Sequence, residues 1–191
     1  MNNLSKICWI LGKNISLELS IREISQKAAV PYTTAYRLIN KNKELFKIRE
    51  QAGVKFCSLK LEDKIIKNYL AIAEREKTEE HLKKYPELFQ LKKNLPIGDY
   101  TLILFGSRAS EKQREKSDVD LCIINKDGKK NINFSSFETL YRLEVNPIFF
   151  TKREFIQMLK EKEVNVGKEI LKNHIILYNE NYFWEVVWNA I

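Results

Sequence analysis

The order of apolar and polar residues near the amino terminus predicts a series of short helices. Leu4, Ile7 and Leu11 recur at helical spacing and indicate that the first element is an amphipathic helix. The stretch Ser20–Glu23 has the pattern of a capping box, in which the first hydroxyl and the last carboxylate each bind a backbone amide. We expect the helix that starts there to run to about Ala28.

A third helix is expected after the turn in "AAVP", because Ala35, Leu38 and Ile39 form an apolar stripe. Its opposite face is polar and basic. The residues of that face are Thr33, Thr34, Tyr36, Arg37 and Lys41. Two short helices joined by a tight turn, with such a face on the second, are what docking in the major groove of DNA requires.

The runs "ELFKIRE" and "VKFCSLKL", on either side of Gly53, predict two strands joined by a turn. Helices and hairpin together resemble a winged helix-turn-helix domain of prokaryotic regulators. This resemblance implies a double-stranded DNA partner, with Arg49 and Lys55 on the wing near the DNA backbone.

The positive charge of the chain is concentrated in this first region. The net charge of the 191 residues is +8, and residues 1–60 carry 11 Lys and Arg against 4 Asp and Glu, which is +7. Residues 61–95 carry +1, and residues 96–191 are neutral. A basic surface attracts phosphate backbones, so a nucleic-acid partner belongs to the first region. A solvated lysine-rich surface is the alternative reading of the same composition.

The segment 61–95 is highly charged, and its apolar residues keep helical spacing, which predicts a helical connector. The carboxyl-terminal "NYFWEVVWNAI" carries an aromatic stripe typical of a core or of a dimer contact, and we expect a homodimer. His81 and His174 are isolated and are interpreted as surface or packing residues. No apolar run approaches the roughly 20 residues of a membrane helix, and we expect a cytoplasmic protein.

The stretch "YTLILFGSRASEKQREKSDVDLCII" contains the strongest chemical pattern in the chain. A buried strand is expected to end at Gly106, where the missing Cβ allows a sharp turn and a close approach to a ligand. Amides and the hydroxyl at Ser107 can then hold phosphate oxygens, and Arg108 can add a charged contact. Asp118 and Asp120 lie on one face of the next strand, where a hard divalent cation would relieve their repulsion.

This stretch contains a strand, a Gly-Ser pair, ten further residues and then Asp-x-Asp at the head of another strand. The order and spacing resemble those of the minimal nucleotidyltransferases of the DNA polymerase β superfamily. The resemblance implies an α+β chain, with a winged helix at 1–60, a connector at 61–95 and a nucleotidyltransferase-like mixed sheet flanked by helices at 96–191. It further implies nucleotide binding at Gly106, Ser107 and Arg108, and catalysis with Mg²⁺ or Mn²⁺ held by Asp118 and Asp120.

One position departs from the family pattern. Active members present a third carboxylate from a neighbouring strand, where this chain has Asn146 in "EVNPIFF". An amide cannot act as a base near neutral pH. Glu144 would share a face with Asn146 in a regular strand, but Pro147 lacks an amide and argues against such regularity.

Three functions are compatible with these patterns. The first is transfer of a nucleotidyl group, AMP if the donor is ATP rather than another nucleoside triphosphate, to a hydroxyl of a protein, RNA or small molecule. A partner toxin is a candidate acceptor, because the spacing matches antitoxins of this family. The second is a catalytically weak or inactive regulator that senses a nucleotide. The third is a structural protein that uses its first domain for protein contacts, against which the local charge of +7 argues.

Overall fold

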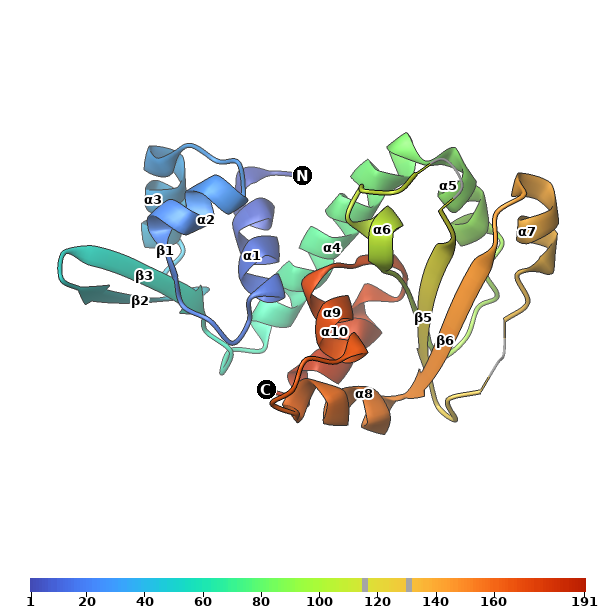
Figure 1. Ribbon diagram of the computed structural model, residues 1–191. Coiled ribbons are helices and arrows are strands. Elements are labelled where there is room, and N and C mark those ends of the chain that lie inside the picture. Colours follow the sequence, from blue (N-terminus) through green and yellow to red (C-terminus); the bar gives the residue numbers. More distant parts are fainter. Residues whose placement is uncertain (115–116, 130–131) are drawn as a thin grey trace. The chain divides into compact units, whose positions relative to one another are not determined.

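A computed structural model describes residues 1–114, 117–129 and 132–191 (Figure 1). These residues form two compact units, residues 1–76 and 77–191, and helix α4 (Ile65–Lys84) contains the boundary between them. Among the helices described, none is both long enough and apolar enough to cross a membrane.

The first unit combines helices with a small antiparallel sheet of strand order β1-β3-β2. Its elements before α4 are α1 (Asn3–Lys13), β1 (Leu19–Ser20), α2 (Ile21–Lys27), α3 (Tyr32–Lys41), β2 (Phe46–Gln51) and β3 (Val54–Leu59). The predicted capping box at Ser20 and Glu23 is confirmed. Gly53 has a φ of +76°, which suits the tight turn between β2 and β3.

The second unit is built on a mixed sheet of strand order β6-β5-β4-β7, in which β5 pairs with β6 in parallel and β4 pairs with β5 and β7 in antiparallel fashion. Its strands are β4 (Thr101–Leu104), β5 (Val119–Asn125), β6 (Val145–Thr151) and β7 (Ile175–Tyr178). Its helices after α4 are α5 (Pro86–Lys93), α6 (Gly106–Ala109), α7 (Ser135–Tyr141), α8 (Lys152–Lys160), α9 (Val166–Lys172) and α10 (Glu180–Trp188).

Helices cover both faces of this sheet. On one face, Leu102 and Leu121 belong to a buried cluster that receives Leu88 from α5 and Phe137 from α7. On the other face, helices α8 and α10 pack against the sheet through aromatic rings. These rings are Phe150 and Phe155, whose centroids are 6.5 Å apart, and Phe183, which is 6.4 Å from Phe155.

The strand through Pro147 is regular, so the expectation that the proline would interrupt it is wrong. Pairing of β5 with β6 continues without a break from Val119 and Val145 to Asn125 and Thr151. Strand β6 is the edge of the sheet, with β5 on one side only. An edge strand tolerates a residue without an amide, because every second amide points away from its neighbour.

Candidate functional site

The Gly-Ser turn is attached to the head of strand β5 through the backbone. The Phe105 amide, just beyond β4, donates to the Asp120 carbonyl at 3.0 Å. Gly106 then has a φ of +70°, and a Cβ placed there would collide with the Asp120 carboxylate and lie 3.1 Å from its Cγ. Glycine at this position therefore permits both the turn and the close approach of the turn to this carboxylate.

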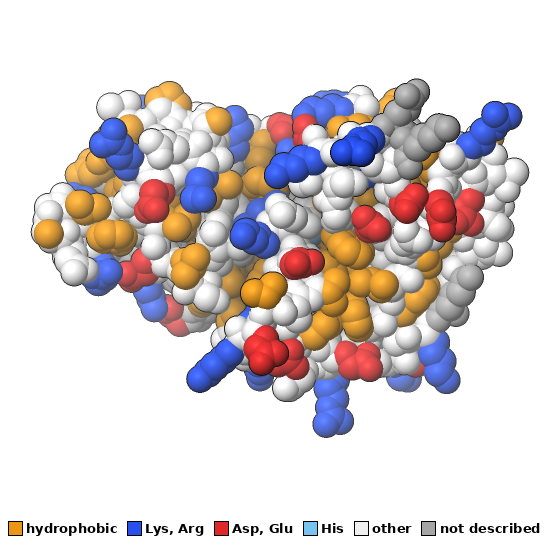
Figure 2. Space-filling view, in the orientation of Figure 1, with side chains coloured by type: hydrophobic (Ala, Val, Ile, Leu, Met, Phe, Trp, Pro, Cys, Tyr) orange, Lys and Arg blue, Asp and Glu red, His pale blue; other side chains and the backbone are white. Residues whose placement is uncertain are grey.

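The two aspartates and Asn146 meet at one end of the parallel strand pair. Asp118 is exposed and directly precedes β5, while Asp120 is half-buried within it. Asn146 pairs with Asp120 in the β5–β6 register, and its Nδ2 donates to the Asp118 Oδ2 at 3.2 Å. Acidic side chains gather over this end of the two strands, above an apolar surface (Figure 2).

The electrostatics of this cluster favour a cation. Partial burial, followed by the charge of nearby Asp118, raises the pKa of Asp120 above its usual value. Two carboxylates and an amide provide oxygen ligands, which suit a hard ion such as Mg²⁺. Within the described ranges, no group of three His, Cys, Asp or Glu side chains is placed to hold a metal. In proteins Mg²⁺ is usually held by one or two carboxylates together with phosphate oxygens of a substrate.

Arg108 holds the segment that leads into β5. The side chain is 5% exposed, and its Nε and one terminal nitrogen donate to the Ser117 carbonyl at 2.9 and 2.7 Å. Nε also lies 3.1 Å from the Asp118 carbonyl, and the other terminal nitrogen is 3.4 Å from the Glu87 carboxylate. The guanidinium therefore contacts other groups of the protein, and these contacts fix the backbone that carries Asp118.

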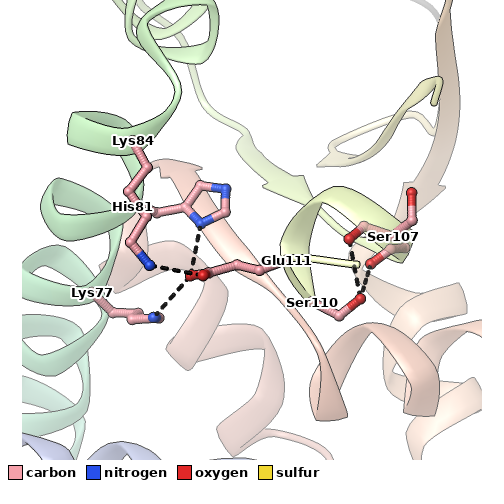
Figure 3. A network of polar contacts seen from close by, with 7 residues as sticks. Lys77, His81, Lys84, Ser107, Ser110 and Glu111 are labelled. Atoms are coloured by element: carbon pink, nitrogen blue, oxygen red, sulfur yellow. Dashed lines mark hydrogen bonds and ion pairs between the residues drawn. The ribbon is translucent and has the colours of Figure 1, made fainter. Parts of the chain in front are cut away.

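A polar network on the other side of the turn ties helix α4 to α6 (Figure 3). The Glu111 carboxylate lies 2.7 Å from the Lys84 Nζ, 3.7 Å from the Lys77 Nζ and 3.8 Å from the His81 Nδ1. The hydrogen bond from Lys84 lowers the pKa of Glu111. The Ser110 hydroxyl donates to the carbonyls of Gly106 and Ser107, which closes the turn.

His81 is fully buried in this network. The centroid of its ring lies 4.6 Å from that of Tyr85, with the two rings tilted by 43°, and burial lowers its pKa to about 4. Sequence reasoning treated His81 as an isolated surface or packing residue and so missed the network. The spacing of Lys77, His81 and Lys84 on one helical face was visible, but nothing in the sequence indicated that Glu111 would meet them.

The predicted DNA-contacting residues lie on two elements of the first unit, α3 and the β2–β3 hairpin. Thr33, Tyr36 and Arg37 are exposed on α3. On the hairpin, the Arg49 guanidinium lies 2.7 Å from the Glu18 carboxylate, and the Lys55 Nζ donates to the Tyr36 hydroxyl at 2.9 Å. Thus α3 and the hairpin meet through Lys55 and Tyr36.

Comparison with known families suggests a general chemistry for most of the second unit. Residues 90–183 match the sequence model of the family described as polymerase beta, nucleotidyltransferase. The match supports membership of the nucleotidyltransferase superfamily and suggests nucleotidyl transfer in general. The matched segment contains Gly106, Ser107, both aspartates and Asn146. Neither the curated proteins nor the solved structures include a match to the chain.

Proposed function

We propose, from the nucleotidyltransferase match and the geometry of the turn, that the second unit binds a nucleoside triphosphate with Mg²⁺ and transfers its nucleotidyl group to a hydroxyl acceptor. With ATP as the donor, the group transferred is AMP. The observation that supports this best is the close approach of Gly106 to Asp120, beside Asp118. A phosphate chain at the turn would then meet backbone amides on one side and the two carboxylates on the other.

Each residue of the site has a distinct role in this proposal. The amides after Gly106 and the Ser107 hydroxyl bind phosphate oxygens. Asp118 and Asp120 hold the cation, which when bound neutralises the triphosphate and polarises the α-phosphorus. Arg108 acts as a positioning residue, because its bonds to the chain keep the start of β5 in place.

The transfer replaces one phosphorus–oxygen bond with another. The acceptor oxygen forms a bond to the α-phosphorus, the bond from that phosphorus to the bridging oxygen breaks, and pyrophosphate leaves with the electron pair. The acceptor proton passes to solvent, because the amide of Asn146 cannot accept it. The rate acceleration would then come from proximity of the reacting groups and stabilisation of the developing charge, and not from base catalysis by Asn146.

We further propose that the first unit is a winged helix-turn-helix that binds double-stranded DNA. Three helices followed by a hairpin, with exposed Thr33 and Arg37 on α3, support this reading. The local charge of +7 in residues 1–60 supplies the attraction to phosphates.

A second candidate function is a regulator whose nucleotidyltransferase fold binds a nucleotide without transferring it. Asn146 favours this candidate, because it occupies the register position beside Asp120 and hydrogen bonds to Asp118 without providing a base. In this reading, the bound nucleotide changes the affinity of the first unit for DNA.

Labelling with α-³²P-ATP distinguishes the two. Incubated with Mg²⁺ and a cell lysate, the full-length enzyme would transfer label to an acceptor, and Asp118→Asn or Asp120→Asn would abolish the transfer. Asp99→Asn, an exposed carboxylate outside the cluster, is the matched control and retains labelling. Labelling that survives both aspartate substitutions contradicts the proposed site. If no acceptor is labelled but the nucleotide changes the affinity of the protein for DNA, the result supports the regulator.

A further inference from the structure

The first unit contains a concave site that shares Tyr36 and Lys55 with the predicted DNA-contacting surface. A cavity of about 670 Å³ opens between α2, α3 and the tip of the β2–β3 hairpin. This volume is within the range of roughly 300–1,000 Å³ that is typical of small-ligand pockets. Its walls include Arg22 and Gln26 from α2, Tyr32 and Tyr36 from α3, and Lys55 from the hairpin.

Two tyrosine rings, tilted relative to each other, form an aromatic wall of this cavity. Tyr32 is 50% exposed and Tyr36 is 37% exposed, and their ring centroids are 6.2 Å apart at an interplanar angle of 31°. Val54 at the hairpin tip is 45% exposed and lines the same cavity. Large apolar side chains in a concave site are suited to a ligand with a flat apolar face.

Tyr36 is held in place by Lys55. The Lys55 Nζ donates to the Tyr36 hydroxyl at 2.9 Å and lies 4.9 Å from the centroid of its ring. The ring is therefore preorganised, and a positive charge lies over it. Arg22, which is exposed, adds a second positive charge to the same cavity. Hydrophobic side chains interspersed with Lys and Arg are visible over this part of the unit (Figure 2).

Flat aromatic walls with adjacent cations match one ligand chemistry closely. A nucleotide that is not base-paired presents both a free base face for stacking and a phosphate for the cations. A DNA duplex presents phosphates, sugars and base edges, while its base faces are stacked inside the helix. The tyrosine wall would therefore remain without a stacking partner on an intact duplex.

We infer that the cavity lined by Tyr32, Tyr36 and Lys55 binds an unpaired nucleotide of a DNA or RNA strand, with its base stacked on the tyrosine rings. This inference deepens the proposed nucleic-acid binding of the first unit and rests on it. It is independent of nucleotidyl transfer by the second unit. DNA and RNA strands both present an unpaired base to this cavity, and they differ in the sugar.

The test is fluorescence anisotropy of the full-length protein with three labelled probes: a mixed-sequence single-stranded DNA, an RNA strand of the same sequence, and the corresponding DNA duplex. Tyr32→Ala and Tyr36→Ala should each weaken binding of a single strand by about 5- to 150-fold, the range expected for the loss of one stacking contact. Tyr36→Phe, which keeps the ring, should cost less than about 3-fold. Phe89→Ala, which removes an aromatic side chain of 51% exposure on α5, is the matched control.

The outcomes separate this inference from the proposed function. Single-strand binding that depends on the tyrosine rings supports the inference, and the preferred strand identifies DNA or RNA as the source. Duplex binding alone, or single-strand binding unchanged in both alanine variants, overturns the inference while leaving duplex recognition intact. Absence of binding to all three probes contradicts the nucleic-acid function of the first unit as well. Circular dichroism of each variant confirms that the unit is folded.

Discussion

Replacing Gly106 with alanine tests how closely the Gly-Ser turn and strand β5 are fitted to each other. The added Cβ would lie 3.1 Å from the Asp120 Cγ and would collide with the carboxylate oxygen, so this side chain must move. The substitution also places an alanine at a φ of +70°, in the left-handed region that glycine occupies without strain.

The two effects have different magnitudes and different readouts. Left-handed strain costs about 1–2 kcal/mol, which should lower the Tm of the second unit by roughly 3–10 °C. Displacement by about 1 Å of a carboxylate that is proposed to hold the cation can cost on the order of 100-fold in rate. We therefore expect Gly106→Ala to lose far more transfer activity than its modest loss of stability would explain.

Gly53→Ala is the matched control, since Gly53 has a φ of +76° and no heavy atom within 4 Å of an added Cβ. It should show the strain without the collision. Differential scanning fluorimetry and the labelled-ATP assay measure the two quantities on the same samples. Gly106→Ala with labelling equal to that of Gly53→Ala would refute the argument, because the contact with Asp120 would then have no functional role.

Three further predictions concern neighbouring residues. Arg108→Met leaves two part-buried carbonyls and one part-buried carboxylate without their donor, so the unfolding free energy should fall by about 2–4 kcal/mol; an unchanged urea midpoint would contradict this. The pKa of His81 is about 4 when folded, against about 6.5 when unfolded, so the unfolded state binds more protons and stability should decrease by up to about 3 kcal/mol as the pH falls from 6.5 to 4. His81→Phe should flatten this dependence in urea titrations at several pH values, and a profile like that of the wild type would sink the assignment. Asn146→Asp restores a third carboxylate, so transfer to a hydroxyl should rise by about 100-fold or more if the missing base limits the rate, whereas a rate that does not rise would point to another limiting step.

The local geometry of the site could be predicted from the sequence because it depends on neighbouring residues. A continuous apolar run, a glycine and two aspartates at strand spacing indicate a strand, a turn and a second strand. The structure accordingly brings Gly106, Asp118 and Asp120 together. The family resemblance that placed Asn146 beside them also agrees with the β5–β6 register.

The remaining features depend on partners that sequence periodicity does not specify. Strand β6 can contain Pro147 only because it lies at the sheet edge, and strand order is a property of the tertiary fold. No sequence pattern marks an arginine as buried, so the carbonyls that Arg108 binds could not be predicted. Likewise, His81 looked isolated because Glu111, whose carboxylate lies 3.8 Å from the His81 Nδ1, belongs to a distant segment of the chain.

The central claim is that the Gly-Ser turn and the two aspartates bind a nucleoside triphosphate together with a divalent cation, whether or not transfer follows. Isothermal titration calorimetry of the full-length protein with ATP, in the presence of Mg²⁺ or of EDTA, tests this directly. The account predicts Mg²⁺-dependent binding that weakens at least about 10-fold in both Asp118→Asn and Asp120→Asn and is unchanged in Asp99→Asn. Binding of equal affinity in EDTA, or in both aspartate variants, would contradict it.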